Sequence, residues 1–399
     1  MQELAEIDKN NLYNCCKIIK NYTNAMTAEY HRLGDYIREV NVRNRELKVT
    51  RLLGLSIEKK FIPSIANIIG TDMAGYKIVH RRQFAYVPVT SRNGEKITVA
   101  LLEDCDEAII SQAYTVFEVV DCEKLLTEYL MMWFRRPEFD RYARFHSHGS
   151  AREVFDWDEL CDVQLPVPSI ERQREIVSEY ETLTRRIRLN NQMIEKLEAT
   201  AQALYHKTFV AGIDKQNLPD GWMAAPLTDI ATFLNGVACQ KFKGDSLPVL
   251  KIRELSQGYI DEKSDMVGGN IPKEYVIHNG DLIFSWSATL FIRVWTGGEC
   301  ALNQHLFKVT PKGFPKWFIQ IQIEKHIEDW NRLISAKATS MGHIKREDLE
   351  NTKIAIPNIN TMRKMDEQMS PIFHAKYLKQ QENTKLTELQ SLLLAKMGQ

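Results

Sequence analysis

An internal repeat is the feature that most constrains this chain, because two copies of one pattern must fold into two similar parts. Residues 155–168 (FDWDELCDVQLPVP) match residues 344–357 (IKREDLENTKIAIP) at an offset of 189. The same offset pairs Leu204 with Leu393 near the end of each half. Several matches in one order at nearly constant offsets exclude chance, so we predict two halves with the same succession of elements.

The earlier part of each half contains short apolar alternations and turn-forming residues. YKIVHRRQFAY (76–86) resembles YVIHNGDLIFSW (275–286), with His80 opposite His278. A short apolar segment that ends in proline follows in both halves, and then about 40 residues that favour helix. We therefore predict an α+β fold in which each half is a mixed α/β globule followed by one long helix.

The domain boundaries follow from the repeat and from helix-breaking residues between the halves. Gly212 and Pro219 interrupt the helix-favouring stretch that precedes them. The predicted parts are an N-terminal lead-in, helical or irregular, at 1–29, a first globule at 30–168, a helix at 169–210, a linker at 211–220, a second globule at 221–357 and a second helix at 358–399.

The two long helical stretches carry the seven-residue repeat of coiled coils. In the first stretch the seam positions are Ile176, Tyr180, Leu183, Ile187, Asn190, Ile194, Leu197, Ala201 and Leu204. The second seam is less complete and consists of Met365, Met369, Ile372, Lys379, Leu386 and Leu393, with Lys376, Asn383 and Gln390 at its other positions. Two incomplete seams indicate that these helices pack on each other as a coiled coil; two unrelated amphipathic helices are the alternative.

A helix pair of this kind would be a spacer between the globules, since a helix of roughly 35–40 residues is about 50–60 Å long. Lys379 stands at the repeat position of Asn190, so both seams become polar at the same level. A single buried polar residue in such a seam can fix its register at a cost in stability.

The sequence lacks the common motifs of catalysis. It contains no GxxxxGK[ST] loop, no HExxH, no GxSxG, and no GxG or Asn-Pro-Pro-aromatic segment for a methyl donor. Seven cysteines include no CxxC pair, and His146 and His148 lack carboxylate or cysteine neighbours. We predict no metal site and no catalytic residue, and we interpret the chain as a binding scaffold rather than an enzyme.

Composition limits the partners and the compartment. The 52 Lys+Arg residues balance 52 Asp+Glu residues, which by itself argues against a chain that holds nucleic acid through a basic excess. The first ten residues, MQELAEIDKN, have no signal-peptide pattern, and no apolar stretch approaches the roughly 20 residues of a bilayer span. We therefore expect a cytoplasmic protein.

Several segments resemble one family in particular. They are LPVPSIERQREIV (165–177), KLEATAQALYHKTFV (196–210), LPDGWMAAPLTDIATFLNG (218–236), YVIHNGDLIFSWSAT (275–289) and IAIPNINTMRKM (354–365). Together they are similar to the specificity (S) subunits of type I restriction–modification systems, in the expected order and over nearly the whole chain. The resemblance implies two target recognition domains, at 30–168 and 221–357, separated by two long antiparallel coiled-coil helices in a pseudo-twofold repeat. One departure is Arg82-Gln83, which stands where the second half has Gly280-Asp281.

The same resemblance implies a function in DNA recognition. Subunits of this kind recognise an asymmetric bipartite DNA target, one half-site per recognition domain, and they dock two methyltransferase (modification) subunits and the restriction subunits. S-adenosylmethionine, ATP and Mg would then belong to the partner subunits, and this chain would bind no cofactor. A non-catalytic coiled-coil adaptor that binds proteins rather than DNA is the alternative. A recognition half of a single-chain enzyme would need a methyltransferase motif, which the chain lacks.

Candidate DNA contacts are residues whose side chains suit base edges or phosphates. In the first half these are Arg81, Arg82, Arg92, Asn93, Lys96, Arg144, His146, Ser150 and Arg152. In the second half they are Lys241, Lys243, Arg293, Gln304, His305, Lys337, Thr339, Ser340 and His343. Trp286 neighbours this set, although its place after an apolar run favours the core. Neither globule is basic, with net charges of −2 for residues 30–168 and +1 for residues 221–357, so we expect weak DNA binding without partner subunits.

Overall fold

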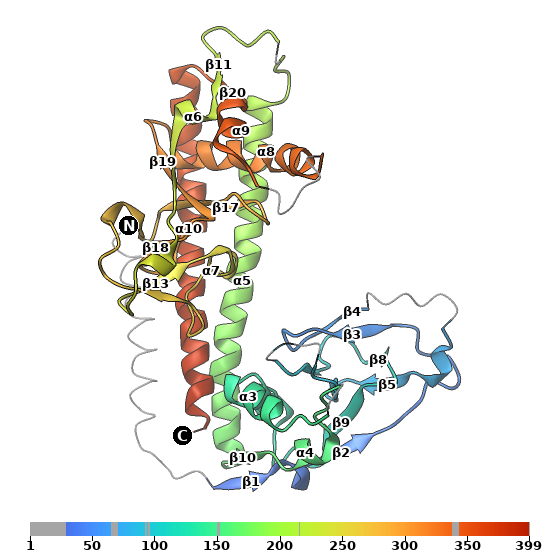
Figure 1. Ribbon diagram of the computed structural model, residues 1–399. Helices are drawn as coiled ribbons and strands as arrows, with labels where there is room; N and C mark the ends of the chain where they lie inside the picture. The colour runs from blue at the N-terminus through green and yellow to red at the C-terminus, as the bar shows by residue number, and fades with distance from the viewer. Residues whose placement is uncertain are drawn as a thin grey trace. The chain divides into compact units, whose positions relative to one another are not determined.

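The computed structural model describes residues 29–64, 71–91, 94, 96–149, 152–214, 216–336 and 343–398. All of the predicted lead-in except residue 29 lies outside the described residues. The protein is mixed α/β, and it divides into two compact units, which are Met1–Thr184 with Leu389–Gln399 (unit 1) and Arg185–Glu388 (unit 2) (Figure 1). The division passes through both long helices, so each unit contains a part of each helix. In the described part of the chain, no helix is both long and apolar enough to span a bilayer.

Unit 1 is built on a four-stranded antiparallel sheet. Its strands, in spatial order, are β2 (Ile37–Val40), β9 (Thr115–Val119), β6 (Phe84–Tyr86) and β7 (Val99–Leu101). Three two-stranded ladders join β1 (Tyr30–Arg32) with β10 (Gln164–Pro166), β3 (Leu53–Leu55) with β4 (Phe61–Pro63), and β5 (Lys77–His80) with β8 (Glu107–Ile110). Phe84 and Phe117 are register partners, and their rings stack at 4.9 Å.

Short helices complete the core of unit 1. They are η1 (Leu33–Asp35), η2 (Met73–Gly75), α2 (Thr127–Phe134), α3 (Pro137–Phe145) and α4 (Trp157–Cys161). Seven of the eight residues of α2 are buried, which follows from its run of apolar residues, TEYLMMWF. Pro137 begins α3, where the missing N–H of proline costs no helical hydrogen bond.

Unit 2 repeats the same sheet order. The strands are β12 (Ala231–Asn235), β19 (Leu306–Pro311), β16 (Leu282–Ser285) and β17 (Phe291–Val294). A second sheet contains β14 (Met266–Val267), β13 (Leu247–Leu250), β18 (Cys300–Leu302) and β15 (Val276–Ile277), and β11 (Met223–Pro226) pairs with β20 (Lys353–Ile356). The helices are α6 (Leu227–Ile230), η3 (Cys239–Lys241), α7 (Ile252–Gln257), η4 (Lys273–Tyr275), α8 (Lys316–Ala336) and α9 (Arg346–Asn351). The order β2-β9-β6-β7 in unit 1 therefore corresponds to β12-β19-β16-β17 in unit 2.

The turn that enters the third strand of each sheet is the same in both units, despite the different residues. In unit 2, Gly280 has φ +93°, and Asp281 Oδ2 accepts from the His278 N–H at 2.9 Å. In unit 1, Arg82 has φ +68°, and Gln83 Oε1 accepts from the His80 N–H at 2.8 Å. Gln83 replaces Asp281 without loss of this bond, but Arg82 occupies a left-handed conformation that favours glycine.

The charges around this turn change together with it. In unit 2, Asp281 pairs with Lys308 of β19 at 2.9 Å. In unit 1, the amide of Gln83 donates to Glu118 of β9 at 2.8 Å. Because an amide can donate where a carboxylate can only accept, glutamine suits an acidic neighbour and aspartate suits a basic one.

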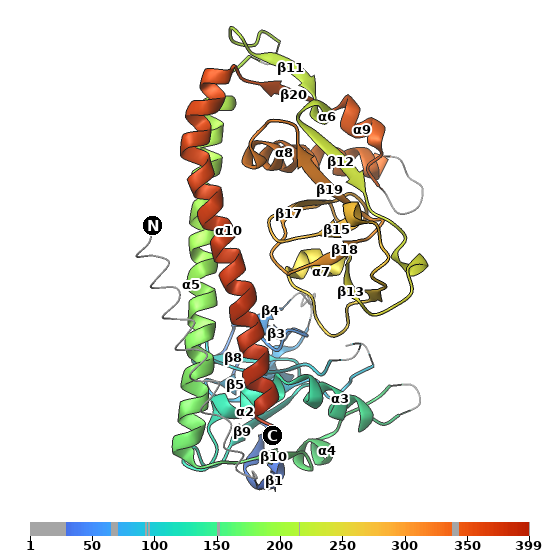
Figure 2. The same cartoon turned by 90° about the vertical axis from the view of Figure 1, so that its left-hand side faces the viewer.

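The long helices are α5 (Ile170–Phe209) and α10 (Ile359–Lys396). In unit 2 their parts run side by side in both views (Figure 1, Figure 2). Their contacts in this unit are antiparallel, because Thr208 meets Met365, Glu198 meets Lys376 at 2.6 Å and Asn190 meets Asn383 at 2.9 Å. In unit 1 the amide of Gln390 donates to Thr184 Oγ1 at 2.7 Å.

The polar residues of the predicted seam have defined partners in the structure. Asn190, only 3% exposed, has Asn383 as its partner rather than Lys379, which instead binds Glu382 at 2.9 Å. The polar positions Lys376, Asn383 and Gln390, which weakened the seam in the sequence, each contact α5 through a polar bond. The apolar ends of the helices pack into the cores, through Ile176, Tyr180, Leu394 and Met397 in unit 1 and Ala201, Tyr205, Met365 and Met369 in unit 2.

Candidate nucleic-acid interface

Three segments of unit 2 meet at one end of its main sheet. Both β12 and β16 pair with β19 in antiparallel fashion, so the residues at and just after the ends of β12 and β16 lie beside the start of β19. These are Asn235 at the end of β12, Trp286 directly after β16, and the turn 303–305 that leads into β19. The sheet register therefore brings three distant parts of the sequence together.

The indole of Trp286 is the centre of this arrangement. Its Nε1 donates to Asn235 Oδ1 at 3.1 Å, and its ring lies 5.6 Å from the ring of Phe307 in the sheet. The imidazoles of His305 and His343 lie 6.2 Å and 5.6 Å from the indole, respectively. Trp286 is half-buried, whereas Asn235 and both histidines are exposed.

A fourth segment, at residues 343–344, is held to the sheet by backbone contacts. Ser287 and His343 form an isolated antiparallel bridge, and the Ile344 N–H donates to the Trp286 carbonyl at 3.0 Å. Ser287 Oγ also lies 3.3 Å from His305 Nδ1. Asn235, Trp286, Ser287, His305 and His343 together form what we call the aromatic–histidine surface.

Close backbone packing orders the loops around this surface. The Gly236 N–H donates to the Leu306 carbonyl at 3.0 Å, and a Cβ at position 236 would lie only 2.1 Å from the Asn303 carbonyl oxygen. A side chain at position 236 would thus push the two loops apart. Asn303 also donates to Gln304 Oε1 at 2.8 Å, which orients that amide.

The structure brings several predicted contacts of unit 2 into this region. Gln304, His305 and His343 lie in or beside the aromatic–histidine surface. Lys241 ends η3, whose Cys239 Sγ contacts the Leu302 carbonyl at 3.7 Å, next to the same turn. Lys243 follows in an exposed position. The predicted residues Lys337, Thr339 and Ser340 lie outside the described residues.

Arg293 is placed elsewhere. Its guanidinium donates to the carbonyls of Leu255 at 3.0 Å and Ser256 at 2.8 Å, near the end of α7. Burial lowers the pKa of Arg293, and its side chain lines a pocket of unit 2. These bonds hold α7 against β17, so we leave Arg293 out of the proposed DNA surface.

The predicted cations of unit 1 are paired with acidic groups and are distributed over separate places. Arg81 pairs with Asp106 at 3.0 Å, and Arg82 pairs with Glu128 of α2 at 2.9 Å. Elsewhere in the unit, Lys96 pairs with Glu58 at 3.2 Å.

A third place in unit 1 contains the segment 144–148. Arg144 pairs with Glu153, and Glu159 accepts both His146 Nδ1 at 2.9 Å and His148 Nε2 at 3.2 Å. The expectation that these histidines lack a carboxylate neighbour is therefore wrong, because α4 places Glu159 between them. Among the described residues, no cluster of three or more His, Cys, Asp or Glu side chains is arranged to hold a metal ion.

Three predicted residues of unit 1, Arg92, Asn93 and Ser150, lie outside the described residues, and Arg152 is exposed. Sequence reasoning missed Asn235 and Ser287. Asn235 could have been found as the Asn-Gly turn signal at the end of an apolar alternation. Ser287 carries no such signal, because its role depends on the bridge to His343.

Comparison with known proteins gives one family. The family model "Type I restriction modification DNA specificity domain" matches the chain twice, at residues 74–199 and 219–390. The chain is 23% identical over 308 residues to the type I restriction enzyme MjaIX specificity subunit of Methanocaldococcus jannaschii, with 70% of each chain covered. It is 20% identical over 455 aligned positions to the type I restriction enzyme HindI specificity subunit of Haemophilus influenzae, with 92% of this chain and 98% of that one covered.

The fold also has a counterpart among solved structures. The crystal structure of a type I restriction–modification system S subunit from M. genitalium matches with a TM-score of 0.55 and 12% identity. The match covers 94% of this chain and 97% of that one.

Proposed function

Because the chain belongs to the family of type I restriction modification DNA specificity domains, we propose that it is the DNA sequence-specificity subunit of a type I restriction–modification complex. This membership confirms the family inferred from the sequence motifs. The observation that carries the proposal is the duplication. The second match to the DNA specificity domain contains the whole sheet β12-β19-β16-β17, and the first contains β9, β6 and β7 of the sheet with the same strand order. Two similar globules in one chain suit a target made of two half-sites.

We assign one half-site to each globule, at residues 30–168 and 221–357. Two globules with the same sheet order but different loops would read two different sequences, so the target is asymmetric. In unit 1 the turn at Arg82 and the segment around His146 are the candidate contacts. Their acidic partners would have to be exchanged for phosphates or bases when DNA binds.

The aromatic–histidine surface is the proposed base-reading surface of unit 2. Amides such as Gln304 and Asn235 can donate and accept at once, as the edge of adenine requires. His305 and His343 supply ring nitrogens that can donate or accept hydrogen bonds, and the rigid indole of Trp286 packs against these side chains and orders them. Lys241 and Lys243 lie where they can bind phosphates next to that surface.

The helix pair is proposed as a coiled-coil spacer that sets the gap between the half-sites and docks the modification subunits. The polar contacts of Asn190 and Lys376 across the pair support one register. The chain itself would be non-catalytic, and methyl transfer, with S-adenosylmethionine, and ATP-driven steps with Mg would occur on partner subunits. Because neither globule is basic, partner subunits would supply much of the phosphate contact, and the complex would act in the cytoplasm.

Methylome sequencing tests this function directly. A host that carries this chain with its modification subunit should show adenine methylation in one asymmetric, two-part motif with a fixed gap. In the variant His305→Ala, His343→Ala, methylation should lose or change one half of the motif and keep the other half. The matched control is His374→Ala, an exposed histidine on α10, which should leave the motif intact. A motif unaffected by the double variant would reject the assignment of this surface, and the absence of any motif would reject the function.

A gel shift separates this function from a protein-binding adaptor. With the modification subunit present, DNA affinity should fall steeply as salt increases, since cations released from the phosphates favour binding. A stable complex with partner proteins that shows no DNA affinity at low salt would favour the adaptor.

A further inference from the structure

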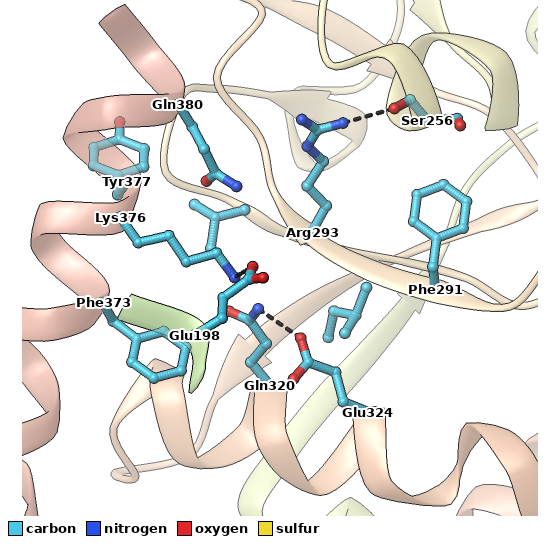
Figure 3. Close-up of a pocket in the computed structure, with 12 residues that line it drawn as sticks. Glu198, Ser256, Phe291, Arg293, Gln320, Glu324, Phe373, Lys376, Tyr377 and Gln380 are labelled. Atoms are coloured by element: carbon cyan, nitrogen blue, oxygen red, sulfur yellow. Dashed lines mark hydrogen bonds and ion pairs between the residues drawn. The ribbon is translucent and has the colours of Figure 1, made fainter. Parts of the chain in front are cut away.

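Unit 2 contains a pocket of ≈240 Å³ that the proposed function does not use. Strand β17 and helix α8 form one side, and α5 and α10 form the other (Figure 3). Its apolar lining comes from Phe291, Ile292, Val294 and Phe373. A volume of this size corresponds to about eight waters, or to a small organic molecule.

Two of the charged groups in the pocket are already satisfied by protein partners. Lys376 of α10 binds Glu198 of α5 at 2.6 Å, and only 14% of the Lys376 side chain is exposed. The Arg293 guanidinium is turned to the carbonyls of Leu255 and Ser256. Neither cation is available to a ligand without breaking these bonds.

Glu324 of α8 is different. Its Oε1 accepts from the Gln320 amide at 2.8 Å, and within the described part of the chain no lysine or arginine forms an ion pair with it. Its side chain is open to solvent through the pocket, yet the surrounding protein atoms desolvate the carboxyl and raise its pKa. A carboxylate in such a setting gains more from a bound cation than one on an open surface.

We propose that this pocket binds a short aliphatic primary amine, of the size of 1,4-diaminobutane, with an ammonium group on Glu324 and the methylene chain along Phe291, Val294 and Phe373. The tetrahedral ammonium supplies hydrogen-bond donors to the Glu324 carboxylate on α8, and the side-chain amide of Gln380 lies across the pocket on α10 (Figure 3). Phe291, Val294 and Phe373 give the methylene chain of an aliphatic amine an apolar contact, which a hydrated metal ion could not use. This inference goes beyond DNA recognition and does not depend on it.

The charged groups around Glu324 also predict how amine affinity depends on pH. The groups that face Glu324 are Lys376, which favours its ionised form, Glu198, which opposes it, and Gln320, which donates to it. Amine binding requires the ionised carboxylate, so affinity should rise as the pH increases through the raised pKa of Glu324. Binding in turn should lower that pKa by linkage.

Calorimetric titration of the full chain with 1,4-diaminobutane tests the proposal, with 1,4-butanediol as the neutral probe of matched length. We expect saturable binding of the diamine and at least tenfold weaker binding of the diol. Glu324→Gln should weaken diamine binding by at least about tenfold, because it removes a charge-assisted contact. The control Glu328→Gln changes an exposed carboxylate one turn further along α8 and should leave affinity unchanged.

Further measurements distinguish a loss of amine binding from a loss of folding. Glu324→Gln should retain or raise the unfolding temperature, because a neutral amide replaces a carboxylate whose ionised form is disfavoured by desolvation. This measurement distinguishes loss of binding from loss of folding. Affinity for the diamine should also fall in the wild-type chain as the pH is lowered. Equal binding of diamine and diol, equal affinity in Glu324→Gln, or no saturable binding at millimolar diamine would each overturn the proposal.

Discussion

Replacing Asn190 with leucine tests whether a buried amide pair holds α5 and α10 in one register. Asn190 is 3% exposed, and its Nδ2 donates to Asn383 Oδ1 at 2.9 Å. Asn383 in turn donates to Asn191 Oδ1 at 2.7 Å. Asn190→Leu removes one donor and sets an apolar side chain against the amide oxygen of Asn383.

The expected magnitude follows from these contacts. A buried polar group that loses its partner costs about 1–3 kcal/mol. Asn383 is half-buried and keeps its bond to Asn191, so we expect Asn190→Leu to lower the free energy of unfolding by about 1–2 kcal/mol. Asn190→Leu combined with Asn383→Leu replaces both partners with apolar groups of similar size and should restore stability to near the wild-type value. The coupling energy between the two sites should therefore equal the sum of the two single losses, which is at least about 1–2 kcal/mol.

Urea unfolding followed by tryptophan fluorescence measures this effect in the full chain. Five of the seven tryptophans lie in unit 2, as do Asn190 and Asn383, so the signal reports mainly on that unit. Gln192→Leu, at an exposed position of α5, is the matched control and should change stability by less than about 0.5 kcal/mol. Single losses that simply add in the double variant, or no loss in either single variant, would refute the register argument. If the helices set the gap, the double leucine variant should also methylate targets of more than one gap length.

Three further predictions concern the sheets and the candidate interface. Arg82 has φ +68°, a backbone conformation that costs a non-glycine residue about 1–2 kcal/mol. In thermal unfolding, Arg82→Gly should therefore be more stable than Arg82→Ala by about 1 kcal/mol. If Arg82→Ala were the more stable variant, the backbone at position 82 would not be strained. Burial raises the pKa of Glu118, but hydrogen bonds from Gln83 and Arg38 outweigh burial and lower it. The stabilisation by Glu118 is thus complete when the pH is above the pKa of 4.5 in the unfolded chain, and it is lost as the pH falls through the lower pKa of the folded state. Glu118→Gln should therefore lower the free energy of unfolding by less than about 1 kcal/mol at pH 7 and should have no effect in strong acid. A cost in urea unfolding that is independent of pH would contradict this linkage. Trp286→Phe keeps an aromatic ring on the sheet but removes the hydrogen bond to Asn235. Gel shifts with the modification subunit should then show DNA affinity reduced by about 2- to 12-fold. Unchanged affinity would argue against a role for the Trp286 indole in ordering this surface.

The turn at Arg82 shows how far sequence comparison reaches. Arg82-Gln83 departs from Gly280-Asp281 in both residue types, yet the hydrogen bonds of the turn are the same in both units. The compensating change lies more than 20 residues away in sequence, where Glu118 replaces Lys308 as the neighbour. Such a pair becomes visible only when the strand register is known.

The seam of the helix pair shows the same limit. Heptad spacing predicts one apolar face on each of α5 and α10, because a helical face is a local property of the sequence. It could not indicate that Asn190 pairs with Asn383 rather than Lys379, since the partner depends on the relative register of two helices. The polar residues that made the second seam look incomplete are the ones that bond across it.

The sequence by itself determined the repeat, the order of globule and helix, and the family, because each of these is expressed in local periodicity and in the order of short motifs. Only the tertiary structure decided which side chains act together. Pairing of β12 and β16 with β19 brings Asn235, Trp286 and His305 to one place, whereas Arg293 is turned to the carbonyls of Leu255 and Ser256 near the end of α7. The physical reason is that contacts between distant segments depend on strand register and on the charges that happen to face each other, and neither is written in the local pattern of the chain.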